Sequence, residues 1–212
     1  MDSGLGYEEA LRSVERIDTT FAGTAFSHHS SNLALLGVTS GTLLSPHDPT
    51  ALLARLRSVF PLTLCDTGGL PIQHIPPALL KQASEIWLVT DQAIGSLVSI
   101  HQTLRELEQR GLRGHELHLL VNRYDPGTGI SDEQIAQRFE LPLLTTLPER
   151  SRSLRSSIGL GRLLTDSSPR DPYVRALAPL LQRLDRRQPS STPASPVSRL
   201  ANLLSRESWK KN

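Results

Sequence analysis

The stretch EIWLVTDQAIGSLVSIHQTLRELEQRG, residues 85–111, joins a short apolar run to a long helical pattern. Residues 85–90 are rich in apolar and β-branched side chains, which favours a buried strand. Beyond them, apolar residues recur every three or four positions, and Gly111 can end a helix in the left-handed conformation. We therefore predict a strand followed by a helix over about 94–110. The apolar face of this helix would consist of Ile94, Leu97, Val98, His101, Leu104 and Leu107.

The same alternation extends over most of the chain. Ser131 precedes two acidic residues and is typical of a helix N-cap. Strands interleaved with helices indicate βαβ units, so we predict an α/β fold with a mostly parallel sheet flanked by helices. Further runs with strand character lie at 33–38, 61–66, 116–122 and 142–147, and further helical patterns at about 49–59, 75–83, 131–139 and 171–187.

Composition places the chain among soluble globular proteins. Its 212 residues are 38% hydrophobic and 21% charged, which is enough to build one sizeable core. Cys65 is the single cysteine and excludes a disulfide framework, in agreement with a cytoplasmic location. We expect Cys65 to be a small buried hydrophobic residue. No apolar run reaches the roughly 18 residues that a membrane-spanning helix needs.

Charge is distributed unevenly along the sequence. Residues 1–185 carry 17 basic and 20 acidic side chains, whereas residues 186–212 carry 6 basic and 1 acidic. An anionic partner would therefore meet the tail. Because the body is mildly acidic, we do not expect a nucleic acid as partner.

The C-terminal part divides into a linker and a tail. Residues 1–187 form the predicted α/β domain, and 188–196 (QPSSTPASP) are a Pro/Ser linker. Residues 197–212 predict a basic amphipathic helix for a membrane surface or a partner, and a disordered solubilising tail is the alternative. The residues that would make this contact are Val197, Leu200, Leu204, Trp209, Lys210 and Lys211.

The sequence PLTLCDTGGLP, residues 61–71, places Asp66 at the end of a predicted strand. Ligands of open parallel sheets bind beyond the carboxyl ends of the strands, and a carboxylate there can hold magnesium. Gly68 would let the backbone approach a phosphate. The alternative is an ordinary junction between a strand and a turn.

The sequence HLLVNRYDPG, residues 118–127, ends a second predicted strand in Asn122 and Arg123. An asparagine amide offers both a donor and an acceptor, which suits the edge of adenine. The alternative is a polar strand end before a turn at residues 125–127.

Two other kinds of site find little support in the sequence. The lysines are Lys81, Lys210 and Lys211, and none of them belongs to a G-x-x-x-x-G-K-[ST] phosphate-binding loop. The histidine pairs at 28–29 and at 115 and 118 have no Cys, Asp or Glu at metal-ligand spacing, so we do not expect a metal there.

Together these segments resemble the MinD/ParA group of deviant-Walker P-loop ATPases, and within it the TadZ/CpaE branch of pilus-assembly proteins. ASEIWLVTDQAIGSLVSIHQTLRELEQRG is similar to the strand and helix unit of that branch, and LLVNRYDPGTGIS to its NRYD element. LPLLTTLPER and GLGRLLTDSSPRDPYVRALAPL are similar to its closing strand and last helices.

The resemblance implies a SIMIBI/MinD-like fold that binds ATP and magnesium and dimerises face to face over the nucleotide. The family's magnesium aspartate corresponds to Asp66, and its adenine-contacting asparagine to Asn122, with Arg123 beside it. The tail resembles the helix with which MinD contacts the inner membrane. The family's P-loop segment is not in this sequence, and we expect that it either lies upstream of Met1 or has been lost.

These observations lead to one main expectation and two alternatives. We expect a protein of the Flp/tight-adherence pilus machinery that lacks the P-loop and does not hydrolyse ATP. The first alternative is a non-enzymatic α/β scaffold or interaction subunit of such a complex. The second is an unrelated, flavodoxin-like binding domain.

Overall fold

The computed structural model describes residues 4–29, 31, 33–38, 49–112 and 116–187. Backbone contacts divide them into two compact units, one ending at Ala83 and one running from Ser84 to Arg187. The linker and the predicted amphipathic tail at 197–212 lie outside the described residues.

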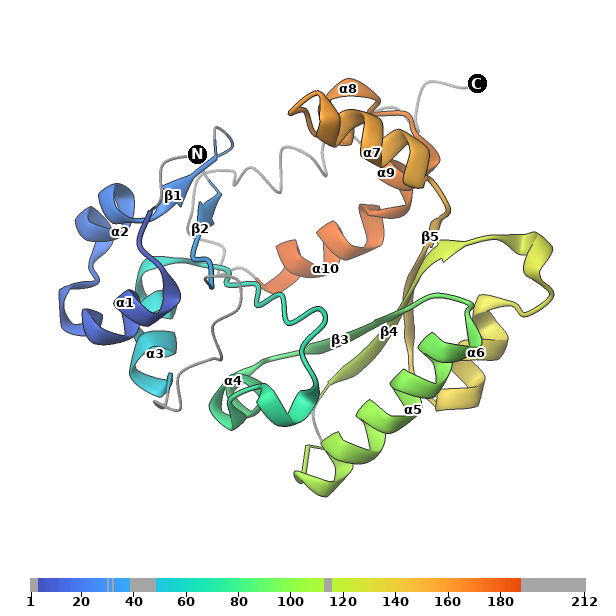
Figure 1. Cartoon of the computed structure of the whole chain (residues 1–212), viewed down its shortest axis with the longest axis horizontal. Helices are drawn as coiled ribbons and strands as arrows, with labels where there is room; N and C mark the ends of the chain where they lie inside the picture. The colour runs from blue at the N-terminus through green and yellow to red at the C-terminus, as the bar shows by residue number, and fades with distance from the viewer. Residues whose placement is uncertain (1–3, 30, 32, 39–48, 113–115, 188–212) are drawn as a thin grey trace. The chain divides into compact units, whose positions relative to one another are not determined.

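The second unit is built on three parallel strands in the order β3-β4-β5 (Figure 1). Parallel neighbours need a crossover connection, and a helix follows each of the first two strands. The predicted strands at 85–90, 116–122 and 142–147 and the α/β class are confirmed. The elements are β3 (Ile86–Thr90), α5 (Ile94–Gln109), β4 (Leu117–Tyr124), α6 (Asp132–Phe139) and β5 (Leu143–Pro148).

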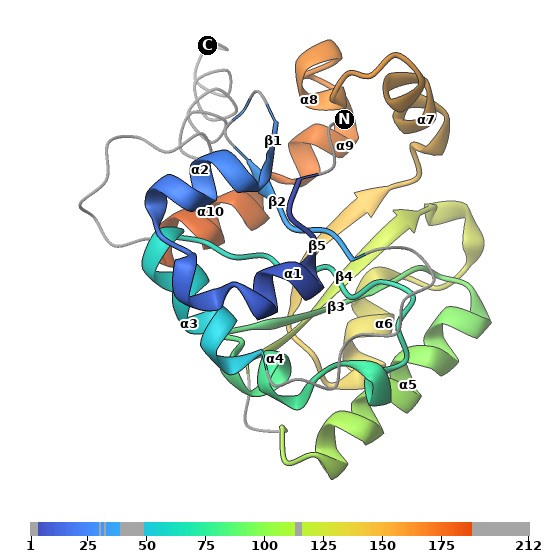
Figure 2. The ribbon, with the colours of Figure 1, turned by 60° about the vertical axis from the view of Figure 1, so that its left-hand side comes forward.

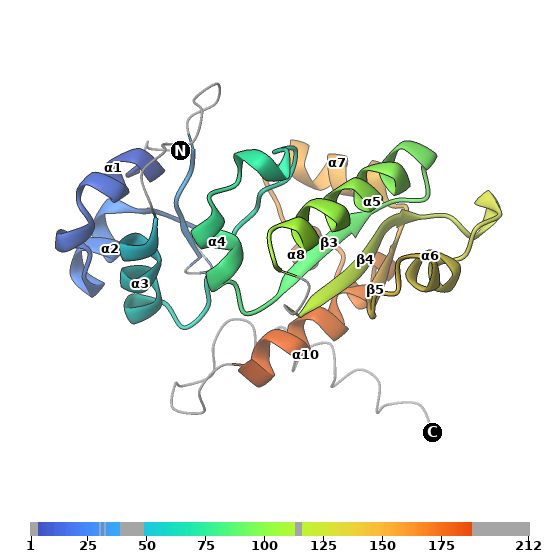
Figure 3. The same cartoon turned by 90° about the horizontal axis from the view of Figure 1, so that it is seen from below.

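The central strand β4 is buried on both faces. Because side chains alternate along a strand, Leu119 and Val121 pack toward Ile135 of α6. Leu120 points the other way and packs with Leu147 and with Leu180 of α10 (Ala178–Arg187). Figure 3 shows α5 and α6 on one side of the sheet and α10 on the other. The unit therefore has three layers.

Local capping signals fix two helix ends as the sequence predicts. The Ser131 hydroxyl accepts the backbone N–H of Gln134 at 3.2 Å, and the Gln134 side chain accepts the N–H of Ser131 at 2.9 Å. This reciprocal pair is a capping box. Gly111 has φ +72° and lets the Leu112 N–H reach the Leu107 carbonyl at 3.0 Å beyond the end of α5.

The inward face of α5 differs from the predicted apolar face. Ile100 and Leu107 are buried, whereas Ile94, Val98 and His101 are exposed. The structure turns the half-buried hydroxyl residues Ser96 and Thr103 inward, together with Leu97 and Leu104. An apolar pattern cannot identify such a face because part of it is polar.

The predicted helix at 171–187 is two helices, α9 (Pro172–Ala176) and α10. Pro179 explains the break, because it has no N–H and its ring clashes with the carbonyl four residues earlier in a continuous helix. Asp171 caps α9 by accepting the Tyr173 N–H at 2.9 Å. Arg150, before α7 (Ser151–Gly159), donates three hydrogen bonds to this buried carboxylate, from Nη2 to Oδ2 at 2.6 Å and from Nε to Oδ2 and Oδ1 at 3.1 and 3.2 Å. α8 (Leu164–Ser167) lies between α7 and α9 in the chain.

The first unit is a small helical cluster with a short antiparallel pair of strands (Figure 2). Its core consists of the buried residues Ala10, Ile17, Ala22, Phe26, Leu52 and Leu56. The elements are α1 (Tyr7–Arg12), a 3-10 turn (Val14–Arg16), α2 (Thr19–Ala25), β1 (Ser27–His28), β2 (Ala34–Leu35), α3 (Thr50–Val59), a second 3-10 turn (Ile72–His74) and α4 (Pro77–Gln82).

Three predictions for this unit are wrong in whole or in part. Residues 61–66 are not a strand, since their backbone pairs with no strand among the described residues. The segment is largely exposed, with Leu64 66% exposed and Cys65 exposed instead of buried. Within the predicted strand 33–38, two residues form β2, which pairs with β1. Apolar runs become strands only where a neighbouring backbone accepts their hydrogen bonds.

Arg183 of α10, far away in the sequence, forms hydrogen bonds with residues at the amino ends of both β3 and β4. Its Nε donates to both carboxylate oxygens of Glu85 at 2.9 and 2.8 Å, and its Nη2 lies 2.6 Å from Nε2 of His118 and 3.3 Å from Glu116. Glu85 also accepts the indole N–H of Trp87 at 2.6 Å. Because a guanidinium only donates, His118 Nε2 must act as acceptor here.

This cluster corrects the expectation that His118 has no carboxylates near it. Ligand atoms of Glu85, Glu116 and His118 lie within 4.8 Å of one another, a spacing that could hold a metal ion. Arg183 bonds to all three groups, so its guanidinium supplies the positive charge that a metal would bring. The cluster is therefore an ion pair network within the fold.

Replacing Arg183 with Met should destabilise the protein by about 3 kcal/mol, because the buried carboxylate of Glu85 would lose its charged partner. Urea unfolding followed by circular dichroism measures the change. Arg186→Met is the matched control on the same helix, where the side chain is exposed. Equal losses in the two variants would contradict the structural role of Arg183.

Asp171 should make stability depend on pH. Hydrogen bonds from Arg150 hold the pKa of Asp171 below its ordinary value. A lowered pKa stabilises the fold above the unfolded-state value of about 4, and this contribution is lost as pH falls through the folded-state pKa. Asp171→Asn should thus reduce the free energy of unfolding at neutral pH, and the curves of the two proteins should converge in acid.

Urea unfolding across a pH series measures this convergence. Asp166→Asn, which changes an exposed carboxylate, is the control and should leave the pH dependence unchanged. A constant difference between wild type and Asp171→Asn at every pH would show that Asp171 acts only through packing or capping.

Candidate functional site

A pocket of about 370 Å³ opens at the carboxyl ends of β3 and β4. This volume is within the range of small-molecule sites. The parallel register pairs Thr90 with Val121, so the residues that follow each of them, Asp91 and Asn122, reach the same edge of the sheet. The pocket is lined by Val89, Thr90, Asp91, Ser96, Ser99, Ile100, Thr103, Asn122 and Arg123.

The floor of polar groups comes from one face of α5. Ser96, Ser99 and Thr103 are three and four positions apart, which places them on one side of a helix. Their hydroxyl groups can both donate and accept hydrogen bonds. The helix that follows β3 thus presents a hydroxyl stripe toward the strand ends.

Asp91 is held at the start of α5 by local hydrogen bonds. Its Oδ1 accepts the Ala93 N–H at 3.0 Å. A hydrogen bond from the Ser96 hydroxyl lowers the pKa of Asp91, with smaller contributions in the same direction from the Ala93 N–H and the positive charge of Arg123, while partial burial opposes them. Asp91 is therefore a carboxylate at neutral pH.

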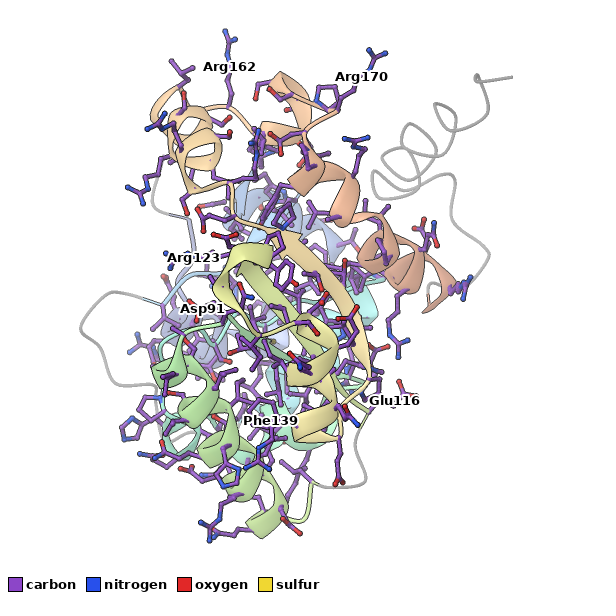
Figure 4. The ribbon with its side chains drawn as sticks, turned by 90° about the vertical axis from the view of Figure 1, so that its right-hand side faces the viewer. Asp91, Glu116, Arg123, Phe139, Arg162 and Arg170 are labelled. Atoms are coloured by element: carbon purple, nitrogen blue, oxygen red, sulfur yellow. The ribbon has the colours of Figure 1, made fainter. Side chains whose placement is uncertain are left out.

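Arg123 adopts an unusual backbone conformation at the end of β4. Its φ of +54° is in the left-handed region, which costs a non-glycine residue about 1 kcal/mol or more. Its Nε donates to Glu149 Oε2 at 3.2 Å, and its Nη1 lies 3.9 Å from Asp91 Oδ2. Figure 4 shows Asp91 and Arg123 close together at this edge and Glu116 far from them. Strained backbone of this kind is frequent at binding sites.

The side-chain amide of Asn122 uses part of its hydrogen-bonding capacity within the local turn. Its Oδ1 accepts the backbone N–H of Arg123 at 2.9 Å. The amide keeps a second lone pair and two N–H donors that can face a ligand. The strained conformation of Arg123 and the orientation of Asn122 thus depend on the same hydrogen bond.

Gln92 connects the two loops that border the pocket. Its Oε1 accepts the Asp125 N–H at 2.7 Å, and its Nε2 donates to the Ile130 carbonyl at 2.7 Å. Asp125 in turn accepts the Gly127 N–H at 2.9 Å, which closes the turn after β4. These hydrogen bonds hold the loops after β3 and β4 in place beside the pocket.

The charges around the pocket limit which kind of ligand it can bind. Among its described lining residues, Arg123 carries a positive charge and Asp91 a negative one, and Glu149 neutralises Arg123 further. Glu149 is ionised, since hydrogen bonds from Ser151 and then Arg123 lower its pKa. A triphosphate would meet two carboxylates and one arginine that is already paired. The hydroxyl groups and the amide suit an uncharged polar ligand such as a nucleoside.

Asp66 and Gly68 belong to the first unit. Asp66 Oδ1 accepts the Gly68 N–H at 2.9 Å in an exposed turn, so the predicted strand end is a turn. A Cβ at Gly68 would lie 3.0 Å from that oxygen, so a larger residue there would make the Asp66 side chain shift. The structure brings Asn122 and Arg123 together in the pocket, and the magnesium role of Asp66 stays a prediction.

Sequence reasoning missed most of the pocket. Asp91, Gln92 and the hydroxyl stripe were not predicted, because attention to apolar spacing on 94–110 hides polar residues at the same spacing. Glu149, the residue directly after β5, joins the site, and no sequence pattern relates it to Arg123. A search for polar residues at strand ends would have found Asp91 and Gln92, since they directly follow β3.

Comparison with known proteins identifies the fold. No family model matches the sequence, and no curated protein is significantly similar to it. The structure resembles a ParA family ATPase from Chlorobium tepidum TLS, with a TM-score of 0.74, 17% sequence identity and coverage of 88% of this chain and 77% of that one. The chain has the ParA/MinD fold.

A second solved structure supports this assignment. A chain of the MinC:MinD cell division protein complex from Aquifex aeolicus has a TM-score of 0.60 and 17% identity, with 86% of this chain and 74% of that one covered. At these identities the likeness concerns the fold. The predicted MinD/ParA-type architecture is confirmed, and the narrower resemblance to TadZ/CpaE stays a prediction. Within the described part of the chain, no helix is both long and apolar enough to cross a membrane.

Proposed function

We propose that this chain is a TadZ/CpaE-like protein that takes part in the assembly and localisation of a Flp (tight-adherence) pilus. The ParA/MinD fold over most of the chain supports this proposal, together with Asn122 at the end of β4 in a polar pocket. The order of the sequence segments that resemble the TadZ/CpaE branch supports the narrower assignment.

The pocket is proposed to bind the nucleoside part of an adenine nucleotide. Asn122 would face the base with its free amide donors, and the hydroxyl groups of Ser96, Ser99 and Thr103 would face the ribose. The near-neutral charge of the pocket supports recognition of the nucleoside instead of the phosphates.

Hydrolysis of ATP is not part of the proposal. A P-loop lysine and its backbone amides provide most of the phosphate stabilisation in this class of ATPase. The 212 residues contain no G-x-x-x-x-G-K-[ST] segment, and Arg123 is engaged by Glu149. The chain would therefore sense or hold a nucleotide without cleaving it, and magnesium bound at Asp66 would be incidental to this role.

Binding of a fluorescent adenosine analogue to the purified chain tests the nucleoside site. Adenosine and ATP should compete about equally well, because the phosphates gain little. Asn122→Asp keeps the acceptor for the Arg123 N–H but loses both donors, so affinity should fall about tenfold. Gln102→Ala, an exposed amide elsewhere on α5, is the control and should bind normally.

Two results would contradict this proposal. Much tighter binding of ATP than of adenosine would mean that the phosphates are recognised. Phosphate release with magnesium above a buffer blank, abolished by Asp66→Ala, would mean that the chain is an ATPase and that Asp66 belongs to its active site.

The proposed partners are a second copy of the chain and proteins of the pilus machinery. MinD, which shares the fold, has been solved in a complex with MinC, and this supports a protein partner here. The tail, through Val197, Leu200, Leu204 and the basic residues after Trp209, is proposed to contact the inner membrane from the cytoplasmic side.

Deletion of the gene should abolish surface Flp pili, because the apparatus would not be assembled or placed correctly. Electron microscopy of the cells and complementation with the wild-type chain measure this effect. Normal piliation after deletion would contradict the pilus role. Complementation by Asn122→Asp, together with a complex that persists without nucleotide, would favour the alternative of a scaffold whose pocket is not used.

A further inference from the structure

The end of α7 and its connection to α8 expose three large apolar side chains. Ile158, Leu160 and Leu163 are 74, 70 and 49% exposed, and every residue from 158 to 163 is exposed. We call this segment the 158–163 tip. Single exposed apolar residues are common, but three large ones within six residues form a cluster of the kind that marks an interaction site.

The 158–163 tip is held in one conformation. Gly161 has φ +63°, which lets the Arg162 N–H reach the Ser157 carbonyl at 3.0 Å. The buried hydroxyl of Ser157 bonds to the Ser167 hydroxyl at 3.1 Å and so links α7 to α8. The apolar side chains are thus presented by a fixed turn, and binding would cost little ordering.

Arginines are frequent in the sequence on either side of the tip, in an otherwise acidic body. Residues 150–176 contain six arginines and two aspartates, whereas residues 1–185 as a whole have a net charge of −3. Asp171 pairs with Arg150. Arg152, Arg155 and Arg162 are exposed and form no ion pair within the described part of the chain. Figure 4 shows the side chain of Arg162 pointing away from the ribbon.

The exposed apolar side chains of the tip, together with Arg162 and the exposed arginines of α7, fit an anionic bilayer surface. The apolar groups can enter the boundary between headgroups and acyl chains, while the arginines meet lipid phosphates. A nucleic acid would bind the arginines through its phosphates but would leave the exposed leucines without a contact. A protein partner would need a matching groove, whereas a bilayer adapts to a protruding turn.

We propose that the 158–163 tip, with Arg152 and Arg155 of α7, is a binding site for anionic lipid headgroups and inserts its apolar side chains into the membrane interface. The site is independent of the tail and of the proposed pilus function. Together with the tail, it would give the chain the two contacts that stable peripheral binding generally requires.

Sedimentation of the full chain with phosphatidylcholine vesicles containing about 30% phosphatidylglycerol tests the proposal. Leu160→Ser should lower the apparent affinity for the vesicles about tenfold. The leucine side chain, which is exposed in the free protein, would be buried in the membrane interface, and serine would not contribute this burial. The double variant Arg155→Gln, Arg162→Gln should also bind about tenfold more weakly at low salt. Vesicles of phosphatidylcholine alone should bind much less protein than the anionic vesicles.

The controls are an equally exposed leucine and an exposed arginine elsewhere. Leu64→Ser and Arg138→Gln should bind vesicles like the wild type. Circular dichroism should show that all variants are folded, which is expected because every substituted side chain is exposed.

Three results would overturn the proposal. The first is that the wild type does not sediment with the anionic vesicles. The second is that Leu160→Ser binds as well as the wild type while deletion of 196–212 abolishes binding, so that the tail alone is responsible for it. The third is that the arginine variants lose affinity for a labelled DNA duplex while their vesicle binding is unchanged, which would identify a nucleic-acid surface.

Discussion

The burial of β4 on both faces is the constraint on which the second unit depends. Leu119 and Val121 are buried on one face of the sheet and Leu120 on the other, so helices must pack against both faces. A strand buried in this way favours parallel neighbours, because each crossover places a helix on a face. The parallel order then brings the carboxyl ends of β3 and β4 to one edge, where the pocket opens.

The two ends of the sheet have different roles. At the amino ends, Arg183 neutralises Glu85 and bonds to His118, so buried charge is used to fasten α10. At the carboxyl ends, Arg123 is exposed, strained and shared between Asp91 and Glu149. The first arrangement stabilises the fold, whereas the second leaves a polar pocket of low net charge. This charge balance is the physical basis for proposing a nucleoside ligand on a fold shared with a ParA family ATPase and with a chain of the MinC:MinD complex.

Sequence patterns predicted the elements that are stabilised locally or by continuous apolar runs. The three strands of the sheet, the cap at Ser131 and the end of α5 at Gly111 are where the patterns place them. The run at 61–66 has the same composition as a strand but no strand to pair with in the described residues. The orientation of α5 was also wrong, because Ser96 and Thr103 share the inward face with apolar residues.

The sequence by itself determined the α/β class, the position of Asn122 and Arg123 at a strand end, and the accumulation of arginines around residues 150–176. Only the tertiary structure decided which distant residues meet. Glu149 reaches Arg123 across 26 residues, and Arg183 reaches Glu85 across 98. The structure also decided that Leu160 is exposed and Leu164 is buried. Spacing describes neighbours along one element, whereas these contacts depend on how separate elements pack against a common sheet.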